Sequence, residues 1–178
     1  MPDEIYDIYD DNGNKTRTAT WTEVHAKGLI HRTTAVLVFK CQSRKELLIQ
    51  RRNHKMEQDP GLWQHSAGGH IISGDTPQDA VKKELKEELF ANHELPDIEI
   101  REISYFLNQD LPNNKEILHL FETIYSGPFY YDEKELAEEP RWIGFDRLLK
   151  DMEENPKKYT HAFRNVIKEY MKLQKKEI

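Results

Sequence analysis

The sequence contains very little cysteine, because Cys41 is the only one in 178 residues. A single thiol cannot form an internal disulfide. The chain also lacks any apolar run that approaches the ~18 residues of a membrane-spanning helix, and it has no internal repeat or low-complexity tract. Its first residues, MPDEIYDIYDD, are acidic and contain no charged-then-apolar signal segment. We therefore expect a cytoplasmic protein with no membrane partner.

Basic residues are outnumbered by acidic ones, with 26 Lys and Arg against 32 Asp and Glu and a net charge of −6. Charges of both signs are scattered, so no basic stripe suggests a nucleic-acid surface, and the acidic bias fits a cation site. A chain with 37% hydrophobic residues is long enough for one sizeable core and short for two. The sequence predicts one domain, with an N-terminal hairpin and extension in residues 1–30 and the core in 31–178.

Strand and turn patterns occupy most of the chain outside its centre. An Asn-Gly turn near residue 13 predicts a β-hairpin in 4–21, and the β-branched run TTAVLVF is typical of a buried strand. Segment 22–30 is ambiguous. Further strands are expected at 33–39, 46–52, 62–67, 98–108, 117–125 and 140–143, with the pair 98–108 and 117–125 antiparallel. Helices are expected at 145–153 and 159–175, and this mixture of elements suggests an α/β/α sandwich.

The most informative stretch runs from Gly69 to Ala91. Thr76 is suited to a helix N-cap, Pro77 to the first helical position, and Asp79 to the acidic position of a capping box. These residues predict a helix that starts at Thr76. Its apolar stripe consists of Val81, Leu85 and Leu89.

Three carboxylates, Glu84, Glu87 and Glu88, lie along one edge of that stripe at spacings of three and four residues. Like charges so placed destabilise an isolated helix by roughly 0.2–0.5 kcal/mol per pair. Three interleaved lysines could offset this repulsion on an ordinary solvated face. The alternative is Mg²⁺, which takes carboxylate oxygens and is often shared with substrate phosphates. The preceding Gly68 and Gly69 let the backbone come close to such an ion.

The stretch from Gly69 resembles the Nudix box, G-x5-E-x7-R-E-U-x-E-E-x-G-U, the signature of hydrolases that cleave a diphosphate linked to another moiety. The matching residues are Gly69, Glu84, Leu85, Glu87 and Glu88. The departures are Asp75 for the first glutamate, Lys83 for arginine and Phe90 for glycine. The resemblance implies a Nudix-type α/β/α sandwich with a mixed sheet, an N-terminal β-hairpin and C-terminal helices.

The departures bear on the site and on the end of the helix. Asp75 is one methylene shorter than glutamate, and Lys83 lacks the bidentate fork of arginine. Phe90 in the left-handed conformation would cost roughly 1–2 kcal/mol. The alternative is a helix that continues and stops at Asn92, because asparagine tolerates that conformation.

The flanking segments HAKGLIHR, LLIQRR and LWQHSAGGHI resemble the Nudix branch related to isopentenyl diphosphate isomerase. In that isomerase, histidines, a cysteine before the box and a late glutamate carry the metal and the proton transfers. The residues that could match the histidines and the glutamate are His25, His31, His70 and Glu116. The cysteine position is Gly68, and Asn114 stands where a second glutamate is expected. Because alkene isomerisation needs an acid–base group on each face, this argues against isomerase activity.

The resemblance implies a site for Mg²⁺, with Mn²⁺ as the alternative. The expected metal ligands are Glu84, Glu87, Glu88 and the Gly69 carbonyl, with Asp75 in support. The expected general base is Glu116, with Glu87 or an acid from residues 133–139 as substitutes. The expected phosphate contacts are Arg51, Arg52 and Lys83. His65, His93, His119 and His161 receive no function, and Trp63 and Trp142 are expected in the core.

The function these residues indicate is Mg²⁺-dependent hydrolysis of a nucleoside diphosphate derivative or another organic diphosphate, a small-molecule partner. One alternative is a catalytically weak nucleotide-binding module, suggested by Asp75, Lys83 and Phe90. The other alternative is an isopentenyl diphosphate isomerase. The sequence does not identify the substrate or the oligomeric state, for which a homodimer is one option.

Overall fold

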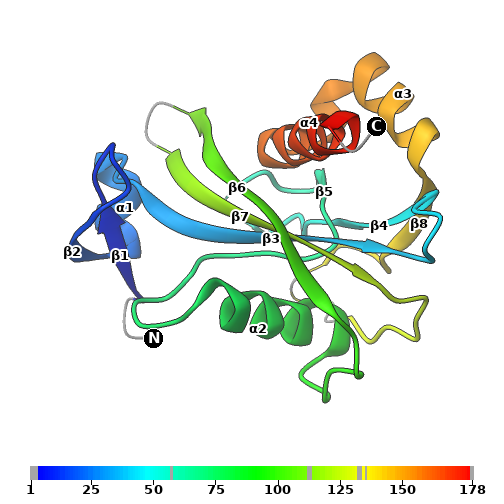
Figure 1. Ribbon diagram of the computed structural model, residues 1–178, viewed down its shortest axis with the longest axis horizontal. Helices are drawn as coiled ribbons and strands as arrows, with labels where there is room; N and C mark the ends of the chain where they lie inside the picture. Colours follow the sequence, from blue (N-terminus) through cyan, green and yellow to red (C-terminus); the bar gives the residue numbers. More distant parts are fainter. Residues whose placement is uncertain (1–3, 57, 112–113, 132–133, 135, 177–178) are drawn as a thin grey trace.

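The computed structural model describes residues 4–56, 58–111, 114–131, 134 and 136–176 (Figure 1). Its helices are α1 (Trp21–Lys27), α2 (Pro77–Phe90), α3 (Phe145–Glu154) and α4 (His161–Lys176), with a 3₁₀ turn, η1 (Pro156–Lys158). Its strands are β1 (Ile5–Tyr9), β2 (Lys15–Thr20), β3 (His31–Phe39), β4 (Glu46–Arg51), β5 (Trp63–Gln64), β6 (Ile100–Leu111), β7 (Asn114–Ile124) and β8 (Arg141–Gly144).

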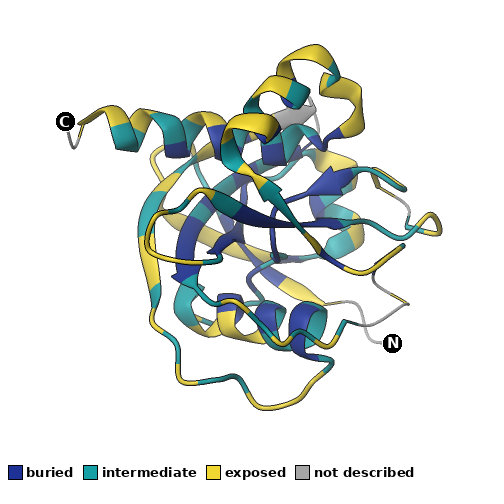
Figure 2. Cartoon of the chain, turned by 90° about the vertical axis from the view of Figure 1, so that its right-hand side faces the viewer, coloured by how far each residue is buried: buried dark blue, intermediate teal, exposed yellow. Residues whose placement is uncertain are grey.

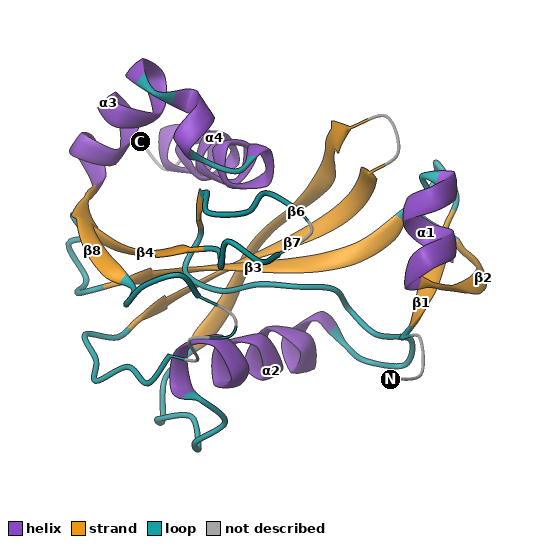
Figure 3. Cartoon of the chain, turned by 180° about the vertical axis from the view of Figure 1, so that it is seen from behind, coloured by secondary structure: helices purple, strands orange, loops and turns teal. Residues whose placement is uncertain are grey.

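The main sheet is mixed, with strand order β5-β4-β3-β7-β6 and β8 paired to β4. Strands β3 and β7 are parallel, and the other pairs of this sheet are antiparallel. Helix α2 covers one face, and α3 and α4 cover the other (Figures 1 and 3). The predicted α/β/α sandwich is therefore confirmed, as are the antiparallel pair β6–β7 and the N-terminal hairpin β1–β2.

The core is divided by the sheet, because alternate residues of β3 point to opposite faces. Leu37 and Phe39 pack with Phe163 of α4, whereas Val36 and Val38 pack with Leu85 of α2. Trp63 belongs to the first cluster, as expected, and Trp142 is partly buried and packs against the second. Figure 2 shows buried positions concentrated on the strands and on the inner sides of the helices.

The ambiguous segment after the hairpin is a helix, α1. Thr20 caps its N-terminus by accepting a hydrogen bond from the Glu23 backbone N–H, and Gly28 ends it at φ 62°. Val24 of this helix is buried with Tyr6 and Ile8 of the hairpin. The extension therefore packs as a small unit beside the start of β3. No helix in the described part of the chain is both long and apolar enough to cross a membrane.

Helix α2 begins as predicted, since the Thr76 Oγ1 atom accepts from the Asp79 backbone N–H at 3.1 Å. It ends at Phe90, two residues before Asn92, the stop that the alternative proposed. The left-handed residues are Ala91, at φ 44°, and Asn92, at φ 65°. Phe90 remains helical and is only 3% exposed, because its ring packs beside Tyr125 and Phe129. The residue that replaces the box glycine thus avoids left-handed strain altogether.

The segment between β5 and α2 runs antiparallel along β3. The Thr34 N–H donates to the Gly69 carbonyl at 2.8 Å and the Gly69 N–H returns a bond at 3.1 Å, while Val36 N–H donates to the Ala67 carbonyl at 2.9 Å. The strand expected at 62–67 is therefore split into the short β5 and this ladder. These bonds position the glycine pair above the start of α2.

Candidate active site

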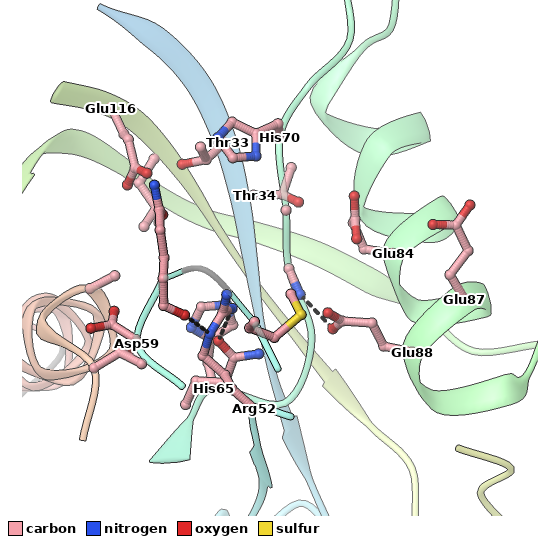
Figure 4. Close-up of a pocket in the computed structure, with 18 of the residues that line it drawn as sticks. Thr33, Thr34, Arg52, Asp59, His65, His70, Glu84, Glu87, Glu88 and Glu116 are labelled. Atoms are coloured by element: carbon pink, nitrogen blue, oxygen red, sulfur yellow. Dashed lines mark hydrogen bonds between the residues drawn. The ribbon is translucent and has the colours of Figure 1, made fainter. Parts of the chain in front are cut away.

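A cavity of about 620 Å³ lies beside the glycine pair, and this volume is in the usual range for small-molecule sites. Its walls come from Glu4, α1, β3, residues 52–56 and 58–59, the segment 64–72, α2, β7 and the start of α4. Figure 4 shows Glu84, Glu87 and Glu88 of α2 on one side and Glu116 of β7 on another. Polar groups from distant parts of the chain therefore converge on one cavity.

The three glutamates of α2 form an acidic wall. The Glu88 Oε2 atom accepts hydrogen bonds from the Gln50 Nε2 atom at 2.8 Å and from the Gly68 backbone N–H at 3.1 Å. Burial, followed by the charges of Glu88 and Glu87, raises the pKa of Glu84 to about 8. Without a bound cation, the Glu84 carboxyl is therefore mostly protonated near neutral pH.

Gly69 makes close contact with this wall. A Cβ atom at position 69 would lie 2.4 Å from the Glu84 Oε1 atom, so any side chain there displaces the carboxylate. The Gly69 carbonyl accepts from Thr34 N–H and has a second lone pair for another partner. Three clustered carboxylates and a carbonyl are oxygen donors of the kind that hard divalent cations prefer, so these residues fit Mg²⁺ or Mn²⁺.

A second cluster, His25, His31 and His70, brings one nitrogen from each ring within 4.8 Å of the others. The His31 and His70 rings stack at 5.1 Å, and in the described part of the chain their Nε2 atoms are buried without hydrogen-bond partners. Burial is the main factor that lowers the pKa of His31 to about 4 and that of His70 to about 3. Neutral imidazoles with unused nitrogens fit a borderline-soft divalent cation.

Glu116 lines the cavity and lies opposite His31 in the parallel register of β3 and β7. It is 8% exposed. Its carboxylate accepts from the Asn108 Nδ2 atom at 2.7 Å and from the Asn114 Nδ2 atom at 3.2 Å. Asn165 of α4 in turn donates to the Asn108 Oδ1 atom at 2.8 Å. Amide donors therefore hold this carboxylate in a defined orientation.

Of the three residues expected to contact phosphate, only two lie at the cavity. Arg52 and Lys83 line the cavity, whereas Arg51 does not. The Arg51 side chain donates to the Gly61 carbonyl at 2.8 Å and forms an ion pair with Glu138 at 3.1 Å. Neighbouring strand residues point to opposite faces. The geometry thus assigns the cavity to Arg52 and not to Arg51.

Among the described residues, the remaining expected acids, Asp75, Glu138 and Glu139, do not line the cavity. Asp75 does not line it, and the Asp75 backbone N–H donates to the Ile72 carbonyl at 3.0 Å just before the α2 cap. In the acidic stretch 133–139, residues 133 and 135 fall outside the described residues. Glu138 is paired with Arg51. The structure therefore does not bring Asp75 or Glu138 to the glutamates of α2.

Sequence reasoning missed several residues that line the cavity. They include Trp21, Lys55, Asp59, Gln64 and His65. Trp21, Lys55 and Asp59 lie outside any pattern, and Gln64 and His65 lie in the LWQHSAGGHI segment, whose resemblance gave them no role. Only the fold brings them to the cavity.

Comparisons with known proteins agree with this geometry. A family model described as NUDIX domain matches residues 31–163. The chain is 30% identical over 170 residues to an isopentenyl-diphosphate Delta-isomerase of Serratia proteamaculans, across 94% of this chain and 91% of that protein. It is also 34% identical over 120 residues to Nudix hydrolase 3 of Arabidopsis thaliana, across 67% of this chain but only 15% of the plant protein.

Solved structures share the fold. A Deinococcus radiodurans protein superposes with a TM-score of 0.76 at 18% identity, covering 93% of this chain and 98% of that one. A MutT protein from Methanosarcina mazei superposes with a TM-score of 0.65 at 17% identity, covering 83% and 95%. The family match spans the sheet, the acidic wall and the start of α4, so the chain belongs to the Nudix family.

Proposed function

We propose that this Nudix hydrolase uses Mg²⁺ to cleave the diphosphate linkage of a nucleoside diphosphate derivative or another small organic diphosphate. The observation that carries the proposal is the acidic wall, in which Glu84, Glu87 and Glu88 share one side of a cavity beside Gly69. Burial, followed by the charges of Glu88 and Glu87, raises the pKa of Glu84, and a bound cation would favour its ionised form. Related folds are consistent with such substrates, since a Shewanella oneidensis NUDIX domain was solved with ADP ribose.

The residues divide the work between metal binding and phosphate binding. Glu84, Glu87, Glu88 and the Gly69 carbonyl would hold Mg²⁺. When bound, the cation neutralises diphosphate charge and lowers the pKa of the attacking water. On the cationic side, Arg52 is positioned by two bonds, from its Nε atom to the Gln58 carbonyl and from its Nη1 atom to the Gln64 Oε1 atom, both at 3.0 Å. This leaves its Nη2 atom for a phosphate oxygen.

Two residues are candidates for the proton acceptor. Glu87 belongs to the acidic wall, and no hydrogen bond to its carboxylate is formed by the described residues. Glu116 accepts amide hydrogen bonds beside the histidine cluster. Such bonds favour the ionised carboxylate. We propose Glu116 as the base, with Glu87 as the substitute, and we place a second divalent cation with His25, His31 and His70.

The direct test is a screen of the purified chain with Mg²⁺ against nucleotides, dinucleotides, nucleotide sugars and prenyl diphosphates, with phosphate release as the readout. Glu116→Gln and Glu87→Gln are then compared on the best substrate. The variant that removes the base should lose most of kcat, and its rate should no longer rise toward alkaline pH. Absence of turnover with every substrate, together with Mg²⁺-dependent binding of one of them, would indicate the nucleotide-binding module instead.

A second candidate function, isopentenyl diphosphate isomerase, is favoured by the relative that matches over most of its length, by the cluster of three histidines and by the register of Glu116 with His31. Against it, Gly68 has no acid–base group where the isomerase pattern places cysteine. A Cβ atom at position 68 would lie 2.3 Å from the Thr34 carbonyl oxygen, so this backbone excludes a side chain there. Deuterium exchange from D₂O into isopentenyl diphosphate, followed by NMR, distinguishes the two functions.

A further inference from the structure

His65 is a buried imidazole that lines the cavity and has no assigned role. It follows β5 directly, is 7% exposed, and its ring meets Phe163 of α4 edge-on at 6.1 Å. Figure 4 shows it on the cavity wall with Arg52. An ordinary core position would suit phenylalanine or leucine equally well, so the polar ring at this place needs an explanation.

The space for this ring depends on Gly68. A Cβ atom at position 68 would lie 2.6 Å from the His65 Nε2 atom. The imidazole therefore occupies the space in which a side chain at position 68 would lie. The His65 ring therefore lies in the cavity beside Gly68, where there is no room for a side chain.

The ring nitrogens have no partner in the described part of the chain. The Nδ1 atom is closed off from solvent and makes no hydrogen bond there. A buried donor without an acceptor is rarer than a buried acceptor without a donor. We therefore assign the proton to Nε2, the atom that faces Gly68. Burial, followed by the charge of Arg52, lowers the pKa of His65 to about 3, so the ring is neutral at physiological pH.

We infer that His65 is a substrate-contacting residue, whose neutral imidazole donates a hydrogen bond from Nε2 to an oxygen of the bound diphosphate beside Arg52. This inference rests on the proposed diphosphate function. The two residues play different parts, because Arg52 supplies charge whereas His65 supplies a donor that stays uncharged. The His65 N–H orients the diphosphate oxygen and adds no second positive charge beside the Arg52 guanidinium.

The test uses the full chain with Mg²⁺ and methylenediphosphonate, a diphosphate analogue whose bridging carbon resists hydrolysis. His65→Phe keeps an aromatic ring against Phe163 and removes both nitrogens, and His65→Gln keeps a side-chain N–H donor. His93→Gln is the matched control, because His93 is exposed and does not line the cavity. Isothermal titration calorimetry should show binding about tenfold weaker in His65→Phe, the size of one hydrogen bond to a charged acceptor. His65→Gln should recover part of the loss, and His93→Gln should match the wild type.

Imidazole nitrogen NMR on the wild-type chain provides a readout that does not depend on any variant folding. Adding methylenediphosphonate should shift the His65 Nε2 resonance, whereas a purely structural ring would keep both nitrogen resonances in place. If His65→Phe binds the analogue as tightly as the wild type, or if the Nε2 resonance does not move when the analogue binds, this inference alone is overturned. Failure of the wild type to bind the analogue, together with no turnover in the substrate screen, overturns the proposed function with it.

Discussion

His31 on β3 lies directly opposite Glu116 on β7, in the parallel register that joins two segments 85 positions apart in the chain. Side chains opposite each other in neighbouring strands project from the same face of the sheet. His70 of the histidine cluster and the amide-bound Glu116 line one end of the cavity, and the glutamates of α2 line the other. This two-ended arrangement leads to the following predictions.

Removing a charge from the acidic wall should abolish activity without unfolding the protein. Glu87→Gln should lower kcat by on the order of 100-fold or more, because cation stabilisation contributes several kcal/mol. Its metal-free stability should stay level or rise slightly, since one repulsion is removed. Glu88→Gln should also lose activity but become less stable by about 1 kcal/mol, because Glu88 accepts bonds from Gln50 and Gly68.

The checks on these two variants are steady-state kinetics with Mg²⁺ and thermal melts in a chelator. Glu153→Gln, at an exposed position of α3, is the matched control and should leave both measurements unchanged. Full-rate turnover in Glu87→Gln would place the metal elsewhere.

The two adjacent glycines should respond differently to alanine. In Gly69→Ala the new Cβ meets the flexible end of Glu84 at 2.4 Å, so the side chain moves and the fold survives. Metal affinity should fall about tenfold. In Gly68→Ala the Cβ meets the Thr34 carbonyl at 2.3 Å, and stability should fall by about 1–3 kcal/mol. Calorimetric Mg²⁺ titration and denaturant melts separate the two outcomes, and equal effects in both variants would contradict the assignment.

The protein should not interconvert alkenyl diphosphates, because Gly68 offers no acid–base side chain. Incubation in D₂O with isopentenyl diphosphate should give no deuterium incorporation by NMR. Gly68→Cys should not restore the reaction, because its Cβ clashes with backbone. Sustained incorporation by the wild type would replace the hydrolase proposal with the isomerase one.

Asp75 should act at the end of the helix and not in the metal site, because it stands outside the cavity beside the Thr76 cap. Asp75→Asn should lose about 0.3–1 kcal/mol of stability, the value of a charge at a helix N-terminus. Its Mg²⁺-dependent rate should match the wild type, as should that of Asp75→Glu. If the Mg²⁺-dependent rate of Asp75→Asn falls by more than its loss of stability explains, Asp75 belongs to the metal site.

The metal-free protein should lose stability as the pH rises from about 7.5 to 8.5. The folded pKa of Glu84, about 8, lies above the value of 4.5 for a free glutamate, so the folded state holds more protons in this window. The buried histidines, whose pKa is near 6.5 in the unfolded chain and lower in the fold, are almost fully neutral in both states only above about pH 7.5, so they contribute little in this window. The slope cannot exceed about 1.4 kcal/mol per pH unit for one proton. Urea melts should show it in chelator, and Mg²⁺ or Glu84→Gln should remove it; a flat profile in chelator would contradict the prediction.

Local sequence determined the helix that carries the acidic wall. The Thr76 and Asp79 cap acts within four residues, and the spacing of Glu84, Glu87 and Glu88 follows from 3.6 residues per turn. The hairpin and most strands were equally readable from turn residues and β-branched runs. Sequence left α1 ambiguous because its seven residues carry only one buried side chain, Val24. Packing against Tyr6 and Ile8 decided that segment.

Only the tertiary structure decided which polar residues share the cavity. Arg51 and Arg52 are equivalent in sequence, but the strand pleat sends one to Glu138 and the other to the cavity. The histidine cluster comes from three separate segments, and His65 occupies a space left by Gly68. Such convergence depends on the register of β3 with β7 and with the glycine segment. Register is set by hydrogen bonds between distant residues, so no local pattern in the sequence reports it.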